Sequence, residues 1–295
     1  MKTLIPIDVW QGNDSLSQDL ARVLPLNQAE IILVYSIQSE PHMEKAAGGG
    51  NGDYLYAELE KKAKSSLESY AQDLKPSCLS VETCFESGPP ASVIESIAKR
   101  KQVDLIVIRG QASGLLESAF QGNTVSLVIK HSPSSILVLR AGAILAPLSK
   151  AIVALDGSQP AKDALRQFCQ LYKPLANNIE IVLAHVVSIA APWRYIAPVE
   201  FIATLEDNLD MAAKAILAEG ETILKDCGWK LNTKSGGMIV RSGDPASELD
   251  RLASEINAGL IVVGAQGKTA VKHFLLGSVS EALAIKSSCP ILVFK

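Results

Sequence analysis

Two glycine-containing segments near the carboxyl end of the chain have the spacing of a phosphate-binding loop. Gly264 and Gly267 flank a tight turn after an apolar run, and Gly277-Ser278 follows after nine intervening residues. Glycine lets backbone N–H groups approach phosphate oxygens, because no Cβ blocks the approach. The Gly277–Ser280 segment is also typical of a helix start, where unpaired amides and the helix dipole favour an anion. A phosphate between the two segments would contact both.

The letters Gly264-Ala265-Gln266-Gly267-Lys268-Thr269 end like a P-loop, but the match fails. A P-loop needs a glycine five positions before its second glycine, where this chain has Val262, and a helix that begins at the lysine. We therefore do not expect a P-loop nucleotide hydrolase. Lys268 would still add a point charge near a terminal phosphate.

Polar residues also follow two other apolar runs of the second half. Asp156-Gly157-Ser158 follows the first run, and His185-Val186 ends the second. An Asp carboxylate accepts hydrogen bonds from an amine or a sugar hydroxyl, although Asp156 and Ser158 both also suit a helix N-cap. His185 has no second His or Cys at ligand spacing, so we expect a strand-end residue rather than a metal ligand.

The elements that must position these residues follow a regular alternation. Short β-branched runs predict strands at 150–155, 179–187, 237–242, 259–264 and 289–294. Longer helical patterns between them predict helices at 159–172, 205–227, 245–257 and 277–287. Such βαβ units form parallel sheets, which bind ligands at the carboxyl ends of their strands, where the strand order reverses. The polar loops are therefore expected to converge.

The first half repeats this organisation. Residues 86–140 align without a gap onto residues 241–295, with identities clustered at element ends. Strands are accordingly predicted near 2–7, 31–36, 79–85, 103–108 and 135–139. The predicted fold class is α/β: two tandem doubly wound, Rossmann-like domains at 1–142 and 148–295, each with a five-stranded parallel sheet.

Composition excludes several classes of protein. The 295 residues are 48% hydrophobic and 20% charged, with a formal net charge of -3, which argues against disorder and against a nucleic-acid partner. No apolar run reaches the roughly 18 residues that span a bilayer, and the amino-terminal residues lack the pattern of a secretory signal. We therefore expect a cytoplasmic protein with no membrane contact. The five cysteines include no C-x-x-C pair and indicate reduced thiols.

The pattern Gly264-x-x-Gly267, nine residues and Gly277-Ser278, followed by Val279-Ser280-Glu281 and a closing strand at 289–293, resembles the ATP-binding type of the universal stress protein family. The segments at 156–158 and 185–186 are similar to the same family. The resemblance covers essentially the whole chain, as two tandem domains. It implies an adenine nucleotide alpha hydrolase-like fold and an adenine nucleotide, ATP, ADP or AMP, at the switch point, with any Mg²⁺ carried by the nucleotide.

The resemblance also implies a role for each matching position. Asp156 would meet the adenine or ribose edge. Ala154 and Val186 would line the base, and Val263 would pack near the ribose. Gly157 and Ser158 belong to the same binding set. The phosphates would be held by Gly264, Gln266, Gly267, Gly277, Ser278, Val279 and Ser280. No catalytic residue and no metal ligand is assigned.

The first half departs from this pattern. The residues that stand in place of Gly264, Gly267 and Ser278 are Arg109, Ala112 and Asn123. A Cβ at Ala112 and the long side chain of Arg109 would crowd the backbone cradle, which predicts a weak or absent site. The alternative is an altered anion site, because a guanidinium binds phosphate in a different geometry. Its residues would be Asp8, Arg109, Gly122 and Asn123.

Three functions remain open at this point. The first is a regulatory, adenine-nucleotide-binding stress-response protein whose two domains pack as two subunits do, as a monomer or a homodimer, with an unknown protein partner. The second is a slow ATPase or phosphotransferase, which would need a base or a positioned water that the loop residues do not offer. The third is an interaction scaffold that binds no nucleotide. Bound nucleotide distinguishes the first two from the third.

Overall fold

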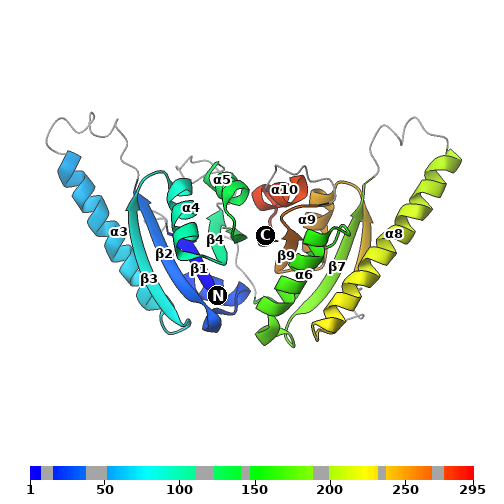
Figure 1. Cartoon of the computed structure of the whole chain (residues 1–295), viewed down its shortest axis with the longest axis horizontal. Coiled ribbons are helices and arrows are strands. Elements are labelled where there is room, and N and C mark those ends of the chain that lie inside the picture. The colour runs from blue at the N-terminus through cyan, green and yellow to red at the C-terminus, as the bar shows by residue number, and fades with distance from the viewer. Residues whose placement is uncertain are drawn as a thin grey trace. The chain divides into compact units, whose positions relative to one another are not determined.

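The computed structural model describes residues 1–7, 16–37, 52–110, 123–140, 147–188, 199–231, 237–267 and 276–295. The chain divides into two compact units, Met1–Leu137 and Val138–Lys295. Within each unit the described residues build an α/β fold around parallel strands (Figure 1). The predicted fold class is confirmed.

The first unit carries its strands in the order β3-β2-β1-β4-β5. The strands are β1 (Lys2–Pro6), β2 (Glu30–Ile37), β3 (Ser80–Ser87), β4 (Leu105–Gly110) and β5 (Ser135–Arg140), which ends just past the unit boundary. Strand β1 pairs in parallel with both β2 and β4. The helices are α1 (Leu16–Val23), the short η1 (Leu26–Gln28), α3 (Gly52–Leu74), α4 (Pro90–Lys101) and α5 (Asn123–His131). Helix α1 packs with α3, and α4 with α5, as expected of a sheet covered on both faces.

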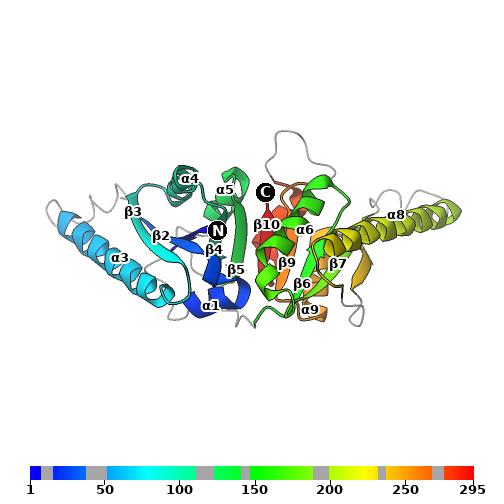
Figure 2. The same cartoon turned by 60° about the horizontal axis from the view of Figure 1, so that its bottom comes forward.

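The second unit repeats the order as β10-β9-β6-β7-β8. Its strands are β6 (Lys150–Ala154), β7 (Glu180–Val187), β8 (Met238–Ser242), β9 (Leu260–Gly264) and β10 (Ile291–Phe294). Its helices are α6 (Gln159–Leu171), the short η2 (Lys173–Leu175), α8 (Val199–Asp226), α9 (Pro245–Glu255) and α10 (Ser278–Lys286). Helix α6 packs with α8 (Figure 2). Helix α9 packs with α10 (Figure 1). The strand order reverses between β6 and β9, which defines the switch point.

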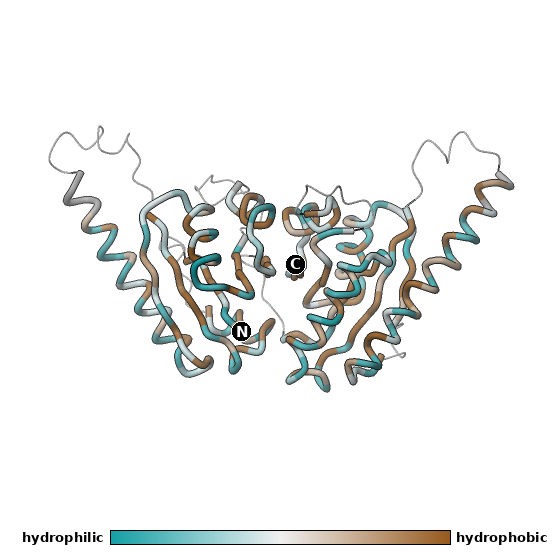
Figure 3. The backbone as a smooth tube through the Cα atoms, viewed as in Figure 1, coloured by the Kyte–Doolittle hydropathy of each residue, from teal (hydrophilic) through white to brown (hydrophobic). Residues whose placement is uncertain are grey.

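Burial on both faces of the sheet explains why the strands are runs of apolar residues. All five residues of β9, Leu260–Gly264, are buried because helices cover both faces of the sheet. The inner strands are mostly brown in Figure 3, whereas the helices alternate between brown and teal. Helix α6 buries a stripe at helical spacing, which includes Ala161, Leu165 and Phe168. This packing holds the carboxyl ends of β6 and β9 in place.

One helix start differs from its prediction. Helix α8 begins at Val199 rather than near 205. The proline-broken sequence at 190–198 has no helical pattern, and the helix begins directly after it. That stretch lies outside the described residues, as does the glycine-rich segment at 42–51.

An ion pair between an edge strand and the following helix is kept in both units with its charges exchanged. Glu86 of β3 pairs with Arg100 of α4. At the equivalent positions Arg241 of β8 pairs with Glu255 of α9. Such partly exposed pairs contribute little to the free energy of unfolding. The two halves have therefore diverged in residue type while keeping the same contact.

Asp244 caps helix α9. Its Oδ1 accepts hydrogen bonds from the Ser247 N–H at 2.9 Å and from the Ser247 hydroxyl at 2.6 Å. These bonds favour the ionised carboxylate and hold the pKa of Asp244 below its ordinary value of 3.8. We expect Asp244→Ala to lower the free energy of unfolding by about 1 kcal/mol at neutral pH.

The sign of the pH dependence follows from that lowered pKa. The charge-dependent part of the cap's stabilisation is fully present above the unfolded value and is lost as the pH falls through the folded value. Urea unfolding of wild type and Asp244→Ala near pH 7 and near pH 3 measures it. The difference between the two proteins should shrink at the lower pH. An unchanged difference would show that the cap does not depend on the carboxylate charge.

Candidate functional site

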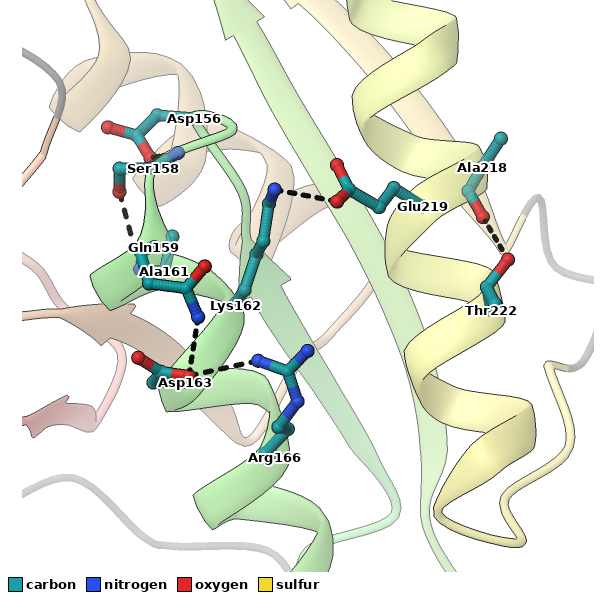
Figure 4. A network of polar contacts seen from close by, with 10 residues as sticks. All are labelled: Asp156, Ser158, Gln159, Ala161, Lys162, Asp163, Arg166, Ala218, Glu219 and Thr222. Atoms are coloured by element: carbon teal, nitrogen blue, oxygen red, sulfur yellow. Dashed lines mark hydrogen bonds and ion pairs between the residues drawn. The ribbon is translucent and has the colours of Figure 1, made fainter.

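The loop after β6 places Asp156 at the carboxyl ends of the strands of the second unit. Its Oδ1 accepts a hydrogen bond from the Ser158 N–H at 2.9 Å, and Gly157 between them has a φ of 81°, which glycine favours. Ser158 is the N-cap of α6, because its Oγ accepts from the Ala161 N–H at 3.3 Å (Figure 4). Of the two residues suited to capping, Ser158 takes the role, and Asp156 orders the turn before it.

The glycine loop after β9 lies directly against Asp156. A Cβ built on Gly267 would lie 2.6 Å from Asp156 Oδ2, well inside van der Waals contact. The loops after β6 and β9 therefore meet at the switch point, as the sequence predicts. Glycine at 267 is what allows the carboxylate to keep its place.

Gly264 has a different structural role. A Cβ there would lie 2.9 Å from the backbone C and O atoms of Pro160 and 3.0 Å from the Ala161 nitrogen. The end of β9 is thus packed on the first turn of α6, and the absence of a side chain permits that approach. Helix packing accounts for glycine at 264, and its contact with phosphate stays a prediction.

The start of α10 returns to the same loop. The Gly277 N–H donates to the Ala265 carbonyl at 2.6 Å, and a Cβ on Gly277 would lie 3.6 Å from the Gly267 nitrogen. Gly277 is the N-cap, and the first helical bond runs from the Glu281 N–H to the Gly277 carbonyl at 3.0 Å. The amides of Ser278, Val279 and Ser280 therefore precede the helical ladder, at the end of the dipole that favours an anion.

The Ser280 hydroxyl is already used within the protein. Its Oγ donates to the Gly264 carbonyl at 2.7 Å, and the residue is 5% exposed. A hydroxyl has one proton to donate, so this bond leaves the backbone amide of Ser280 for an anion. Ser278, by contrast, is exposed. The hydroxyl bond ties α10 to the end of β9 and so holds the two glycine segments together.

The apolar residues assigned to the base and the ribose lie on three strands. Ala154 ends β6 and Val186 lies near the end of β7, both partly exposed, whereas Val263 of β9 is 4% exposed. His185 Nδ1 lies 2.6 Å from the Leu155 carbonyl, a hydrogen bond that holds the residue before Asp156. The side chain of Val263 is therefore part of the core, and its packing near a ribose stays a prediction.

Helix α8 contributes residues that the sequence patterns did not connect with the site. Gly220 lies against Leu155, where a Cβ would overlap the Leu155 side chain and lie 3.1 Å from Leu183 Cδ1. Lys162 Nζ of α6 bonds Glu219 Oε1 of α8 at 2.6 Å (Figure 4). An isolated glycine inside a helical pattern is the signal that points to such close packing. Helix α8 thus supports the residue next to Asp156.

Further expectations about the site concern metal ligands and residues outside the described part of the chain. Among the described residues, no group of three or more His, Cys, Asp or Glu side chains has the arrangement of a metal site. Lys268 lies outside the described residues, as do Asp8 and Gly122 of the first half. Within the described part of the chain, no helix is both long and apolar enough to cross a bilayer.

The first unit uses Arg109 in an ion pair. Its Nη2 donates to Asp19 Oδ2 at 3.0 Å, with the two side chains 19% and 10% exposed, and Arg22 Nη1 lies 3.6 Å from Asp19 Oδ1. Asn123 begins α5, and its side chain is outside the described part. Because Asp19 compensates the guanidinium charge, Arg109 is less suited to attract an anion than a free arginine.

We expect Arg109→Met to lower the free energy of unfolding by about 2 kcal/mol, because a mostly buried carboxylate loses a direct partner. The double variant with Asp19→Asn should recover part of that loss, and thermal unfolding of the four proteins measures the coupling. Strictly additive effects of the two substitutions would contradict an interaction between Arg109 and Asp19.

Fold and site together define a class of protein: two tandem doubly wound α/β domains, the second with two glycine segments that meet at its switch point. The model of the universal stress protein family matches residues 1–140 and 148–295. The chain therefore belongs to the universal stress protein family and contains two of its domains in tandem.

Individual relatives agree with this assignment. The stress response protein NhaX of Bacillus subtilis is 30% identical over 159 residues, which are 49% of this chain and 96% of that protein. The universal stress protein YxiE of the same organism is 28% identical over 50% of this chain and 99% of its own. The crystal structure of a universal stress protein from Archaeoglobus fulgidus matches the fold with a TM-score of 0.67 at 19% identity, covering 100% of this chain and 96% of that one.

Proposed function

We propose that the second domain binds an adenine nucleotide, ATP, ADP or AMP, and that the protein has a regulatory role in a stress response. The observation that carries the proposal is the 2.6 Å hydrogen bond from the Gly277 N–H to the Ala265 carbonyl. It brings the amino-terminal amides of α10 beside Gly267, which itself lies against Asp156. The names of the two Bacillus subtilis relatives, a stress response protein and a universal stress protein, support the stress-response part.

Charge supports one orientation of the nucleotide. The Asp156 carboxylate is an acceptor for a sugar hydroxyl or an exocyclic amine and repels phosphate. The amides of Ser278 and Val279 are donors at the positive end of a helix dipole. The base and ribose therefore lie toward the loop after β6, and the phosphates lie toward α10. Ala154 and Val186 offer partly exposed apolar contacts on the base side.

The first domain, proposed as residues 1–142, is expected to bind nucleotide weakly or not at all. Arg109 replaces the glycine that packs on the first helix and is paired with Asp19. The second domain, proposed as 148–295, therefore accounts for one nucleotide per chain. Binding rather than turnover is proposed, because hydrolysis requires a positioned water or base near the phosphates, and the proposed orientation places Asp156 on the side of the base and ribose.

The test is the identity and amount of nucleotide released from the purified, heat-denatured full-length protein, measured by chromatography and mass spectrometry. Calorimetric titration with ATP, ADP and AMP follows if the protein is purified empty. About one adenine nucleotide per chain is expected. No release together with no titratable binding overturns the proposal in favour of an interaction scaffold.

Two other outcomes would correct parts of the proposal. About two nucleotides per chain would show that the first domain also binds. A time-dependent conversion of bound ATP to ADP would favour the slow ATPase. The variant Asp156→Asn keeps the size of the side chain and removes its charge, so it isolates the contribution of that charge to nucleotide binding.

A further inference from the structure

Two cysteines of the second domain are brought together from elements far apart in the sequence. Cys169 lies in the last turn of α6, and Cys227 directly follows α8. The Cys227 N–H still donates to the Ile223 carbonyl at 3.0 Å, so this residue continues the helical pattern. Helices α6 and α8 pack against each other, which brings Cys227 close to Cys169; burial first, and then the nearby Cys227 thiol, raise the pKa of the Cys169 thiol.

The chain after Cys227 holds this arrangement. Gly228 has a φ of 78° and turns the backbone, after which the Trp229 N–H donates to the Leu224 carbonyl at 2.9 Å. The Trp229 indole Nε1 donates to the Cys169 carbonyl at 3.2 Å, and its ring lies 5.8 Å from the ring of Phe168, centroid to centroid. Trp229 is 4% exposed. The residue two positions after Cys227 is therefore anchored on the backbone of Cys169 itself.

Exposure distinguishes the two thiols. Cys169 is 2% exposed, whereas Cys227 is partly exposed. Burial, with a smaller contribution from Cys227, raises the pKa of the Cys169 thiol above its ordinary value. A protonated, buried thiol is a poor target for a dissolved oxidant, so Cys227 is the one that meets it first.

We propose that Cys169 and Cys227 are a peroxide-sensitive pair that closes to a disulfide. Hydrogen peroxide transfers one oxygen to the Cys227 sulfur, which forms a sulfenic acid and releases one water. The Cys169 thiol then passes its proton to the sulfenic acid oxygen while its sulfur attacks the Cys227 sulfur, so the S–S bond forms, the S–O bond breaks and a second water leaves. Two thiols and one peroxide give one disulfide and two waters. This chemistry is independent of the proposed nucleotide site.

The other cysteines are internal comparisons. Cys78 and Cys84 are partly exposed, as Cys227 is. The Cys78 thiol donates to the Leu74 and Ser80 carbonyls, and the Cys84 thiol donates to the Glu82 carboxylate. Cys289 is buried, donates to the Ala258 carbonyl at 3.3 Å, and has its pKa raised by burial to about 12. Cys169 and Cys289 are both buried, and Cys169 differs from Cys289 in having the Cys227 thiol nearby.

The experiment uses the reduced, full-length protein. Hydrogen peroxide is added stepwise until Cys84 is measurably oxidised, the remaining thiols are alkylated, and the protein is digested without reductant for mass spectrometry. We expect a cross-linked pair of peptides that contain Cys169 and Cys227, lighter by two hydrogens than the two reduced peptides and separated again by dithiothreitol. The thermal transition of the oxidised second domain should shift upward, because the bridge restricts the unfolded chain.

Single variants test the order of the steps. In Cys227→Ser, Cys169 should stay a free thiol after peroxide. In Cys169→Ser, with Cys169→Ala as a second variant if serine disturbs the core, Cys227 should accumulate as a sulfenic acid that dimedone traps. Recovery of both thiols at a peroxide concentration that oxidises Cys84 would overturn the proposal. So would conversion of Cys227 to sulfinic acid in the wild type while Cys169 stays a thiol.

Discussion

Gly277→Val should weaken binding of an adenine nucleotide by at least about 100-fold, a loss of about 2.7 kcal/mol, with little change in melting temperature. A Cβ at 277 would lie 3.4 Å from the Ala265 carbonyl oxygen and 3.6 Å from the Gly267 nitrogen, which are ordinary contacts. The φ of -80° is one that valine adopts without strain. The γ-methyl groups would instead cover the Gly267 amide and the approach to α10.

Calorimetric titration and thermal unfolding of the same preparations measure both parts of this prediction. The matched control is Gly122→Val, at the corresponding position of the first half, which should leave nucleotide affinity and stoichiometry unchanged. Gly277→Ala should give a smaller loss of affinity, because alanine adds only the Cβ. Equal weakening by the two valine variants would contradict the assignment of the site to the second domain.

Gly264→Ala should instead destabilise the second domain, by about 3 kcal/mol, and lower its melting temperature by roughly 6–12 °C. Its Cβ would lie within 3.0 Å of three backbone atoms, contributed by Pro160 and Ala161. Backbone atoms cannot rotate away as the end of a side chain can. Either α6 or the end of β9 must move, and either movement disturbs the packed core.

Gly267→Ala is the matched variant for this second prediction. Its Cβ would meet one carboxylate oxygen of Asp156, at the end of a rotatable side chain. The variant should therefore lose less than about 1 kcal/mol of stability but bind nucleotide more weakly, since Asp156 is displaced. Differential scanning calorimetry separates the two substitutions. A melting temperature unchanged by Gly264→Ala would show that α6 packs on β9 less closely than these distances indicate.

Much of the fold was predictable because its signals are local. A fully apolar run such as Leu260–Val263 indicates a strand covered on both faces, and the spacing of buried residues in α6 indicates an amphipathic helix. Because the chain contains the same organisation twice, these patterns occur in both halves. The carboxyl-end rule for parallel sheets then places the loops after β6 and β9 side by side without coordinates. The resemblance to the universal stress protein family rests on the same local residues.

Side-chain roles within the site were less predictable. A sequence does not distinguish a glycine that leaves room for a side chain, as Gly267 does for Asp156, from one that lets a helix approach, as Gly264 does for α6. Nor does it show whether the hydroxyl of Ser280 is free to donate. That hydroxyl donates to the Gly264 carbonyl because α10 returns to the end of β9. The distances between elements decide such roles, and periodicity does not encode those distances.

The amino-acid sequence by itself determined the class of fold, the repeat and the positions of the glycine segments, because these depend on residue type and spacing along the chain. The tertiary structure decided which distant residues meet: Arg109 with Asp19, Gly220 with Leu155, and Trp229 with Cys169. Each of these contacts joins two elements whose faces are set by the packing of the whole domain. Contacts of this kind arise only when the core is assembled, since no local pattern specifies the partner across it.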